Sequence, residues 1–88
     1  MIRKTVTVIN SSGLHLRPAG ILVDLAKKCR STTTLYKGDK KVNLKSVLSL
    51  MAAGVKCKDE IVLECEGETE EADLAALAEA IESGLGET

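Results

Sequence analysis

The chain has 88 residues, 44% of them hydrophobic and 28% charged, a composition typical of one small globular domain. Its 12 Lys and Arg residues nearly balance its 13 Asp and Glu residues, so net charge does not favour binding to nucleic acid or anionic lipid. No apolar run is long enough to cross a bilayer, and the alternating N-terminus does not resemble a signal peptide. We therefore expect a single cytoplasmic domain over residues 1–88, with no membrane insertion and no direct nucleic-acid binding.

The cysteine pattern predicts free thiols. Cys29, Cys57 and Cys65 form no C-x-x-C pair, which argues against a disulfide framework, a zinc site or a redox motif. We expect neither a metal nor a cofactor.

Charge is unevenly distributed along the chain. Acidic residues crowd the last third, whereas basic residues gather in the middle, at Lys27, Lys28, Arg30, Lys37, Lys40, Lys41 and Lys45. This segregation predicts a positive end of the fold that attracts acidic partners.

The first elements in chain order are a strand and a helix. Residues Ile2 to Ile9 alternate between apolar and polar, the pattern of a half-buried strand, and the polar run at 10–13 breaks it. A helix is predicted from about Leu16 to Cys29, with Pro18 in its first turn, where a missing N–H group does no harm. Its predicted buried stripe follows helical spacing and consists of Leu22, Leu25, Ala26 and Cys29.

A hairpin and a short helix follow. Thr32 to Lys37 is rich in β-branched residues and is joined to Lys40 to Asn43 by a glycine-containing turn, which predicts two antiparallel strands. Val47 to Ala53 is predicted to form a two-turn helix, with Ser46 as its N-cap and Gly54 as its terminator.

The last third predicts one more strand and one more helix. Glu60 to Glu66 alternates, which places Ile61, Leu63 and Cys65 inward. Thr69 is the predicted cap of a final helix that ends at Gly84 and carries acidic residues in its first turn. The buried stripe of this helix is predicted to be Leu74, Leu77, Ala78 and Ile81.

The resulting order, β-α-β-β-α-β-α, predicts an α+β fold. Short connections make it compatible with an antiparallel sheet covered on one face by helices, in two layers. With Tyr36 as the only aromatic residue, aliphatic side chains must form the core.

The candidate chemical site is the segment that contains the chain's only histidine, His15. Backbone N–H groups at the start of a helix lack intrahelical acceptors and stabilise an anion, and Arg17 adds a planar cation suited to phosphate oxygens. A histidine ring is a nucleophile in its neutral form, and the ring of a phosphohistidine is a good leaving group once it is protonated. The sequence shows no nucleotide loop and no second histidine, so we interpret the segment as a relay and not as a self-sufficient enzyme. The alternative is that His15 and Arg17 are ordinary surface residues and that Leu14 and Leu16 staple the helix entry.

Two segments of the chain resemble one known family. The run GLHLRPAG resembles the active-site signature of HPr, the histidine-containing phosphocarrier of the bacterial phosphoenolpyruvate-dependent sugar phosphotransferase system, and VNLKSVLSLMAAG resembles its regulatory serine segment. The resemblance implies an open-faced β-sandwich with three helices on one face of a four-stranded sheet in the order 1-4-2-3. It also implies that Enzyme I phosphorylates His15 on Nδ1, that Arg17 contacts the phosphoryl group, and that sugar-specific IIA proteins receive it. Such a carrier works most simply as a monomer.

Two positions depart from the usual family pattern. Residue 16 is Leu16 instead of a small residue or threonine, and Gly20 replaces a more usual Ala, Thr or Ser. Both lie beside the predicted phosphate site, so we expect them to influence which partners dock.

Ser46 has a structural and a functional interpretation. It is a predicted N-cap, and it also resembles the serine that an ATP-dependent HPr kinase/phosphorylase modifies in Gram-positive relatives to create a corepressor for a catabolite-control transcription regulator. A phosphate at a helix N-terminus is tolerated by the fold, so its effect should be felt at docking surfaces.

The short helix carries more apolar residues than so small a domain easily buries. Some of them are expected to form an exposed patch that meets partner proteins, and the alternative is that all pack inside. The apolar residues of the short helix are Val47, Leu48, Leu50 and Met51, and the expected docking residues are Leu16, Gly20, Val47, Leu48 and Met51.

Two other functions remain as alternatives. One is a regulatory binding module of the same fold acting through Ser46, against which the presence of both His15 and Arg17 argues. The other is an RNA-binding α+β domain, which the lack of stacking aromatic residues and of net basic charge disfavours.

Overall fold

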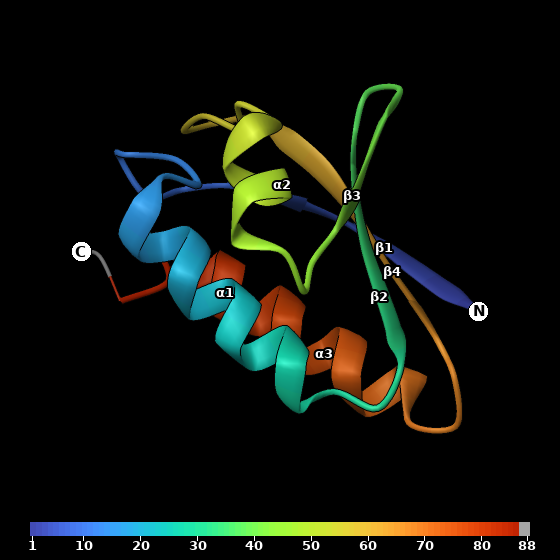
Figure 1. Cartoon of the computed structure of the whole chain (residues 1–88). Helices are drawn as coiled ribbons and strands as arrows, with labels where there is room; N and C mark the ends of the chain where they lie inside the picture. Colours follow the sequence, from blue (N-terminus) through green and yellow to red (C-terminus); the bar gives the residue numbers. More distant parts are fainter. Residues whose placement is uncertain (87–88) are drawn as a thin grey trace.

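A computed structural model describes residues 1–86, which form one sheet and three helices (Figure 1). The elements in chain order are β1 (Ile2–Thr7), α1 (Leu16–Lys28), β2 (Thr32–Lys37), β3 (Lys40–Asn43), α2 (Val47–Ala52), β4 (Glu60–Glu66) and α3 (Glu70–Glu82). This order confirms the predicted β-α-β-β-α-β-α arrangement. Among the described residues no helix is both long and apolar enough to span a membrane.

The four strands form a single antiparallel sheet in the order β1-β4-β2-β3. The register places Leu35 of β2 opposite Leu63 of β4 on one side and Val42 of β3 on the other. Because side chains alternate between the two faces of a strand, these residues share the face that the helices cover. Figure 1 shows all three helices on that one side, so the open-faced, two-layer α+β architecture is confirmed.

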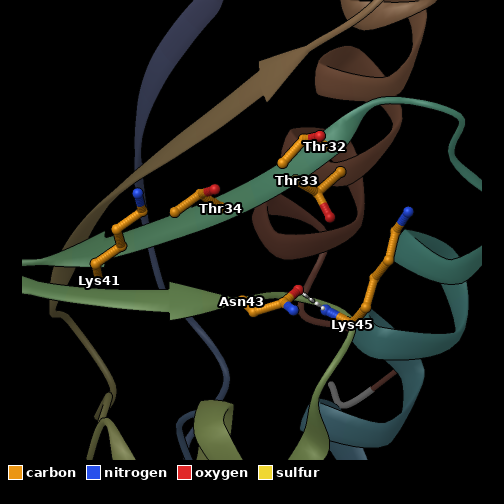
Figure 2. Close-up of a pocket in the computed structure, with 6 residues that line it drawn as sticks. All are labelled: Thr32, Thr33, Thr34, Lys41, Asn43 and Lys45. Atoms are coloured by element: carbon orange, nitrogen blue, oxygen red, sulfur yellow. Dashed lines mark hydrogen bonds between the residues drawn. The ribbon is translucent and has the colours of Figure 1, made fainter.

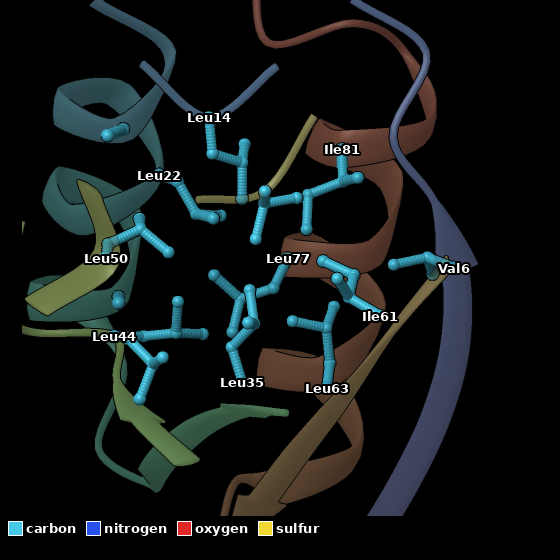
Figure 3. Packing of buried hydrophobic residues seen from close by; sticks show 14 of the residues in the cluster. Val6, Leu14, Leu22, Leu35, Leu44, Leu50, Ile61, Leu63, Leu77 and Ile81 are labelled. Atoms are coloured by element: carbon cyan, nitrogen blue, oxygen red, sulfur yellow. The ribbon is translucent and has the colours of Figure 1, made fainter. Parts of the chain in front are cut away.

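The core lies between the sheet and the helices and is built of aliphatic side chains. Figure 3 shows Leu35, Ile61 and Leu63 pointing from the sheet toward Leu77 and Ile81 of α3. All five side chains are at most 1% exposed, which confirms the inward positions predicted for β4 and the stripe predicted for α3.

The predicted stripe of α1 is only half correct. Leu22 and Ala26 are fully buried, but Leu25 and Cys29 are only partly buried. The structure instead buries Ala19 and Val23, because α1 packs against both α2 and α3 and presents a wider face than a single stripe.

Strand β1 ends at Thr7, two residues before the predicted end. Val8 still pairs with the segment before β4, since its N–H donates to the Asp59 carbonyl at 3.0 Å and its carbonyl accepts from Lys58 N at 2.7 Å. Lys58 has a left-handed backbone (φ 75°), which interrupts the regular ladder.

Thr69 precedes α3 as predicted, but it does not cap the helix through its side chain. Its hydroxyl donates instead to Asp73 Oδ2 at 2.7 Å, and the same oxygen accepts from Ser31 N at 3.1 Å and Ser31 Oγ at 2.5 Å. Asp73 therefore ties the start of α3 to the loop between α1 and β2. Sequence pattern could not reveal this contact, because Ser31 and Asp73 are far apart in the chain.

An Asp73→Asn variant is expected to lose about 1–2 kcal/mol of stability at about pH 7, because it loses charged hydrogen bonds. Hydrogen bonds from Ser31 and Thr69 hold the pKa of Asp73 below its ordinary value of 3.8. A lowered pKa contributes stability above the unfolded-state value that is lost as the pH falls through the folded-state value. The difference in the free energy of unfolding between the variant and the wild type, measured by urea denaturation, should therefore become smaller as the pH is lowered. Exposed Asp24→Asn is the control, and a gap that does not change with pH would contradict the assignment.

Candidate functional site

His15 occupies the position directly before the first residue of α1. Its backbone is extended (φ −90°, ψ −167°), and its carbonyl accepts the N–H of Ala19 at 2.8 Å. The imidazole does not cap the helix, is exposed, and makes no hydrogen bond to another of the residues 1–86. The ring is therefore available to a partner.

The loop before His15 is held firmly against the segment after α2. Leu14 is buried, and its N–H donates to the Val55 carbonyl at 3.0 Å. Gly13 has a left-handed backbone (φ 66°), and its carbonyl accepts from the side-chain amide of buried Asn10. A Cβ atom at Gly13 would collide with the Val55 carbonyl and lie 2.8 Å from Lys56 Cα. Only glycine fits this close approach, which places His15 at the surface.

Arg17 lies in the first turn of α1 and is exposed. Among the described residues no carboxylate forms an ion pair with it, and the first turn of α1 contains no acidic residue. Pro18 supplies no N–H, but the N–H groups of Leu16 and Arg17 lie where an α-helix lacks internal acceptors. The positive end of the helix dipole and a free guanidinium therefore lie beside the imidazole, an arrangement suited to a phosphate anion.

A hollow of about 310 Å³ lies next to His15. It lies between the loop before α1, the end of α2 and the segment that follows α2. Its lining residues are Ser12, Leu14, His15, Met51, Gly54, Val55 and Lys56. Sequence reasoning singled out Met51 but missed Ser12 and Lys56. No local signal marks Lys56, because only the packing of α2 against α1 brings it near the histidine.

Ser46 is the N-cap of α2, as predicted, and its Oγ accepts the N–H of Ser49 at 3.2 Å. Position 20 in α1 is half-buried with open space where a Cβ would lie, so packing does not require Gly20.

The apolar residues around α2 divide between core and surface. Leu50 is fully buried, and Val47 and Met51 are half-buried against the core. Leu48 is 82% exposed and Leu16 is 67% exposed. The prediction that some, but not all, of the apolar side chains of α2 are exposed is confirmed. Leu50 is not one of the exposed side chains.

The three cysteines are free thiols. Burial raises the pKa of Cys65 to about 11, so this thiol is poorly reactive, and burial also raises the pKa of Cys29. Within residues 1–86 no group of His, Cys, Asp and Glu side chains is arranged to hold a metal ion.

Comparison with known proteins agrees with this geometry. The family described as the PTS HPr component phosphorylation site matches residues 2–83. The chain belongs to the HPr family. Members of this family are phosphocarriers of the phosphotransferase system.

Two curated HPr relatives match most of the chain. The phosphocarrier protein HPr of Treponema pallidum is 39% identical over 77 residues, which cover 88% of each chain. HPr of Chlamydia trachomatis is 39% identical over 83 residues, covering 92% of this chain and 74% of that protein.

A solved HPr structure has the same fold. The crystal structure of HPr-C-His from Thermoanaerobacter tengcongensis superposes with a TM-score of 0.96 at 40% identity, covering 100% of this chain and 99% of that one. The HPr fold predicted from the sequence is thereby confirmed.

Proposed function

We propose that this HPr-family chain accepts a phosphoryl group from Enzyme I on His15 and passes it to sugar-specific IIA proteins. The observation that carries the proposal is the exposed imidazole at the N-terminus of α1, beside Arg17, neither of which has a hydrogen-bond or ion-pair partner within residues 1–86. The chain acts as a relay and requires no metal or cofactor of its own.

The transfer needs only groups that meet at this end of α1. A neutral ring nitrogen, which family resemblance assigns to Nδ1, attacks phosphorus, so that an N–P bond forms while the bond from phosphorus to the donor breaks. The first-turn N–H groups and Arg17 stabilise the negative oxygens during the transfer. In the second step a IIA nucleophile attacks phosphorus, and the N–P bond breaks with the ring leaving once it is protonated.

Incubation with phosphoenolpyruvate and a bacterial Enzyme I tests the proposal. Intact mass measurement should show one added phosphoryl group, which is lost in acid because phosphohistidine is acid-labile. Addition of a IIA protein should then discharge the carrier. A chain that stays unmodified with an active Enzyme I would refute the assignment.

An Arg17→Ala variant is expected to lose on the order of a hundredfold in the rate of phosphoryl transfer, because one preorganised electrostatic contact to the phosphoryl group is removed. The transfer rate of Arg17→Lys should lie between those of the wild type and Arg17→Ala, since lysine keeps the charge but not the planar guanidinium. Rapid-quench measurement of the labelling rate provides the readout. An unchanged rate in Arg17→Ala would show that the guanidinium does not contact the group in transfer.

We further propose that Ser46 is a regulatory site for an HPr kinase/phosphorylase. With that kinase and ATP, one acid-stable phosphate should appear on the wild type and be missing from Ser46→Ala. Ser49→Ala, three residues further along α2, is the matched control and should still be labelled. The Ser46→Ala variant should lose on the order of 1 kcal/mol of stability, because the cap to Ser49 N is lost. Labelling that persists in Ser46→Ala would contradict the site.

The surface around these two sites is the proposed docking surface. It comprises Leu16, Gly20, Val47, Leu48 and Met51, and its most exposed apolar side chains are Leu48 and Leu16. Exposed apolar side chains beside polar ones are typical of protein interaction sites. Phosphorylation of Ser46 would add negative charge at one edge of this surface and so change partner choice, including binding to a catabolite-control transcription regulator.

A regulatory module that acts only through Ser46 is the second candidate function. The exposed Ser46–Ser49 cap supports it, and it predicts a chain that accepts phosphate from the kinase but not from Enzyme I. The two labelling experiments therefore separate the candidates.

A further inference from the structure

A second polar cavity lies beside the open end of the β2–β3 hairpin, and none of its lining residues lines the hollow next to His15. Its volume is about 510 Å³. Figure 2 shows its lining residues, which are Thr32, Thr33, Thr34, Lys41, Asn43 and Lys45.

The cavity exists because β3 leaves β2 early. Strand pairing between them runs only as far as Thr34 opposite Asn43, while β2 continues back to Thr32, which pairs with β4 alone. Asn43 Oδ1 accepts the N–H of Lys45 at 2.9 Å and turns the chain toward α2. Beyond that pair the Leu44 N–H still donates to the Thr33 carbonyl at 3.3 Å, so the β3 side of β2 is left without a partner strand only from Thr32.

The lining groups are almost all hydrogen-bond donors or cations. The Asn43 side-chain oxygen is already occupied, which leaves its amide nitrogen to donate. Lys41 makes no ion pair or hydrogen bond with another described residue, and Lys45 Nζ reaches only the Cys29 carbonyl, at a long 3.4 Å. Donors and cations without a lining carboxylate are suited to an anion.

Thr33 gives an independent indication that the cavity is a binding site. It is only 2% exposed, and its hydroxyl has no hydrogen-bond partner in the described part of the chain. Figure 2 shows this hydroxyl turned from β2 toward the side of Asn43 and Lys45. Because buried polar side chains nearly always have a partner, an unsatisfied hydroxyl at the wall of a donor-rich cavity indicates where a ligand oxygen would bind.

The carboxylates of the neighbouring strand do not compete strongly for these cations. Glu64 is bonded to Arg3 Nε at 2.6 Å and accepts a long bond from the Tyr36 hydroxyl at 3.4 Å. Glu66 lies opposite Thr32 across the strand pair and does not line the cavity.

We propose that this cavity binds a phosphate group, either as inorganic phosphate or as the phosphate of a small phosphomonoester. Lys45 balances its charge, Asn43 Nδ2 donates to its outer oxygens, and Thr33 Oγ1 donates to the innermost one, while Lys41 adds positive charge at the other end of the cavity. This site is separate from the proposed phosphotransfer on His15 and does not depend on it.

Titration of the ¹⁵N-labelled full chain with inorganic phosphate, at constant ionic strength set by chloride, tests the site by NMR. We expect saturable changes in the amide chemical shifts of Thr33, Thr34, Asn43 and Lys45. A parallel titration with a sugar phosphate distinguishes the two ligands. Tenfold tighter binding of the sugar phosphate would identify a phosphomonoester as the ligand, and equal affinity would identify inorganic phosphate.

Variants provide the control. The double variant Lys41→Gln/Lys45→Gln should bind at least tenfold more weakly at the cavity, whereas exposed Lys58→Gln should bind as the wild type does. Arg17→Ala should remove shifts at the start of α1 and leave those at the cavity unchanged. The proposal would be overturned by chemical-shift changes that are confined to residues 15–17 or do not saturate. Phosphate binding by the double variant as tight as that of the wild type would also overturn it.

Thr33→Val provides a second measurement that does not depend on the lysines. It should weaken phosphate binding at the cavity severalfold without lowering stability in phosphate-free buffer, because the deleted hydroxyl has no protein partner. A marked loss of stability would show that the hydroxyl serves the fold, and it would overturn the role assigned to Thr33.

Discussion

A His15→Ala variant is expected to carry no acid-labile phosphate after incubation with phosphoenolpyruvate and Enzyme I. His15 is the only histidine in the chain, so its removal eliminates the only imidazole nucleophile. Intact mass measurement before and after acid treatment provides the readout. The loss should be complete, in contrast to the partial loss expected for Arg17→Ala.

The His15 variant should remain folded, which makes its loss of labelling interpretable. The ring is exposed and caps no helix N–H, so the free energy of unfolding should change by less than about 0.5 kcal/mol in urea denaturation. Labelling retained in the alanine variant would place the phosphoryl group on another residue.

Gly13→Ala is expected to produce the largest change in stability, on the order of 3 kcal/mol, from backbone strain and overpacking together. Gly13 has φ 66°, and an added Cβ would meet the backbone of Val55 and Lys56. Neither can yield easily, because the Val55 carbonyl also accepts the Leu14 N–H at 3.0 Å. The loop that holds His15 must therefore shift, and the rate of phosphoryl transfer should fall as well.

Gly38→Ala is the matched control for this substitution. Gly38 has nearly the same backbone angle (φ 59°), but an added Cβ meets nothing within 4 Å. Gly38→Ala should lower the free energy of unfolding by only about 1 kcal/mol, the strain of a left-handed alanine, and should leave the rate of phosphoryl transfer unchanged. Equal losses in the two variants would show that the approach of Gly13 to Val55 is not what limits the site.

The elements were predictable because their signals are local. The alternation of Glu60–Glu66, the serine before α2 and the β-branched run of β2 depend on residues within a few positions of one another. The boundaries of β2, β3 and β4 agree with the structure for this reason. The end of β1 was wrong, because Lys58, distant in the chain, breaks the ladder there.

Side-chain roles were less predictable where two elements meet. Thr69 has the residue type of a cap, yet its hydroxyl donates to Asp73, whose other partner is Ser31. Likewise, spacing along α1 could not show that Val23 is buried more deeply than Leu25, because that depends on contact with two other helices.

Local sequence specifies the order of the elements, the placement of His15 and Arg17 at the start of a helix, and the cap at Ser46. These depend on backbone propensities and hydrogen bonds between near neighbours in the chain. Long-range packing, in contrast, places Lys56 beside His15 and opens the donor-rich cavity where β3 leaves β2. Both features depend on how segments distant in the chain pack together, and the residues around each position do not indicate which distant segment will contact it.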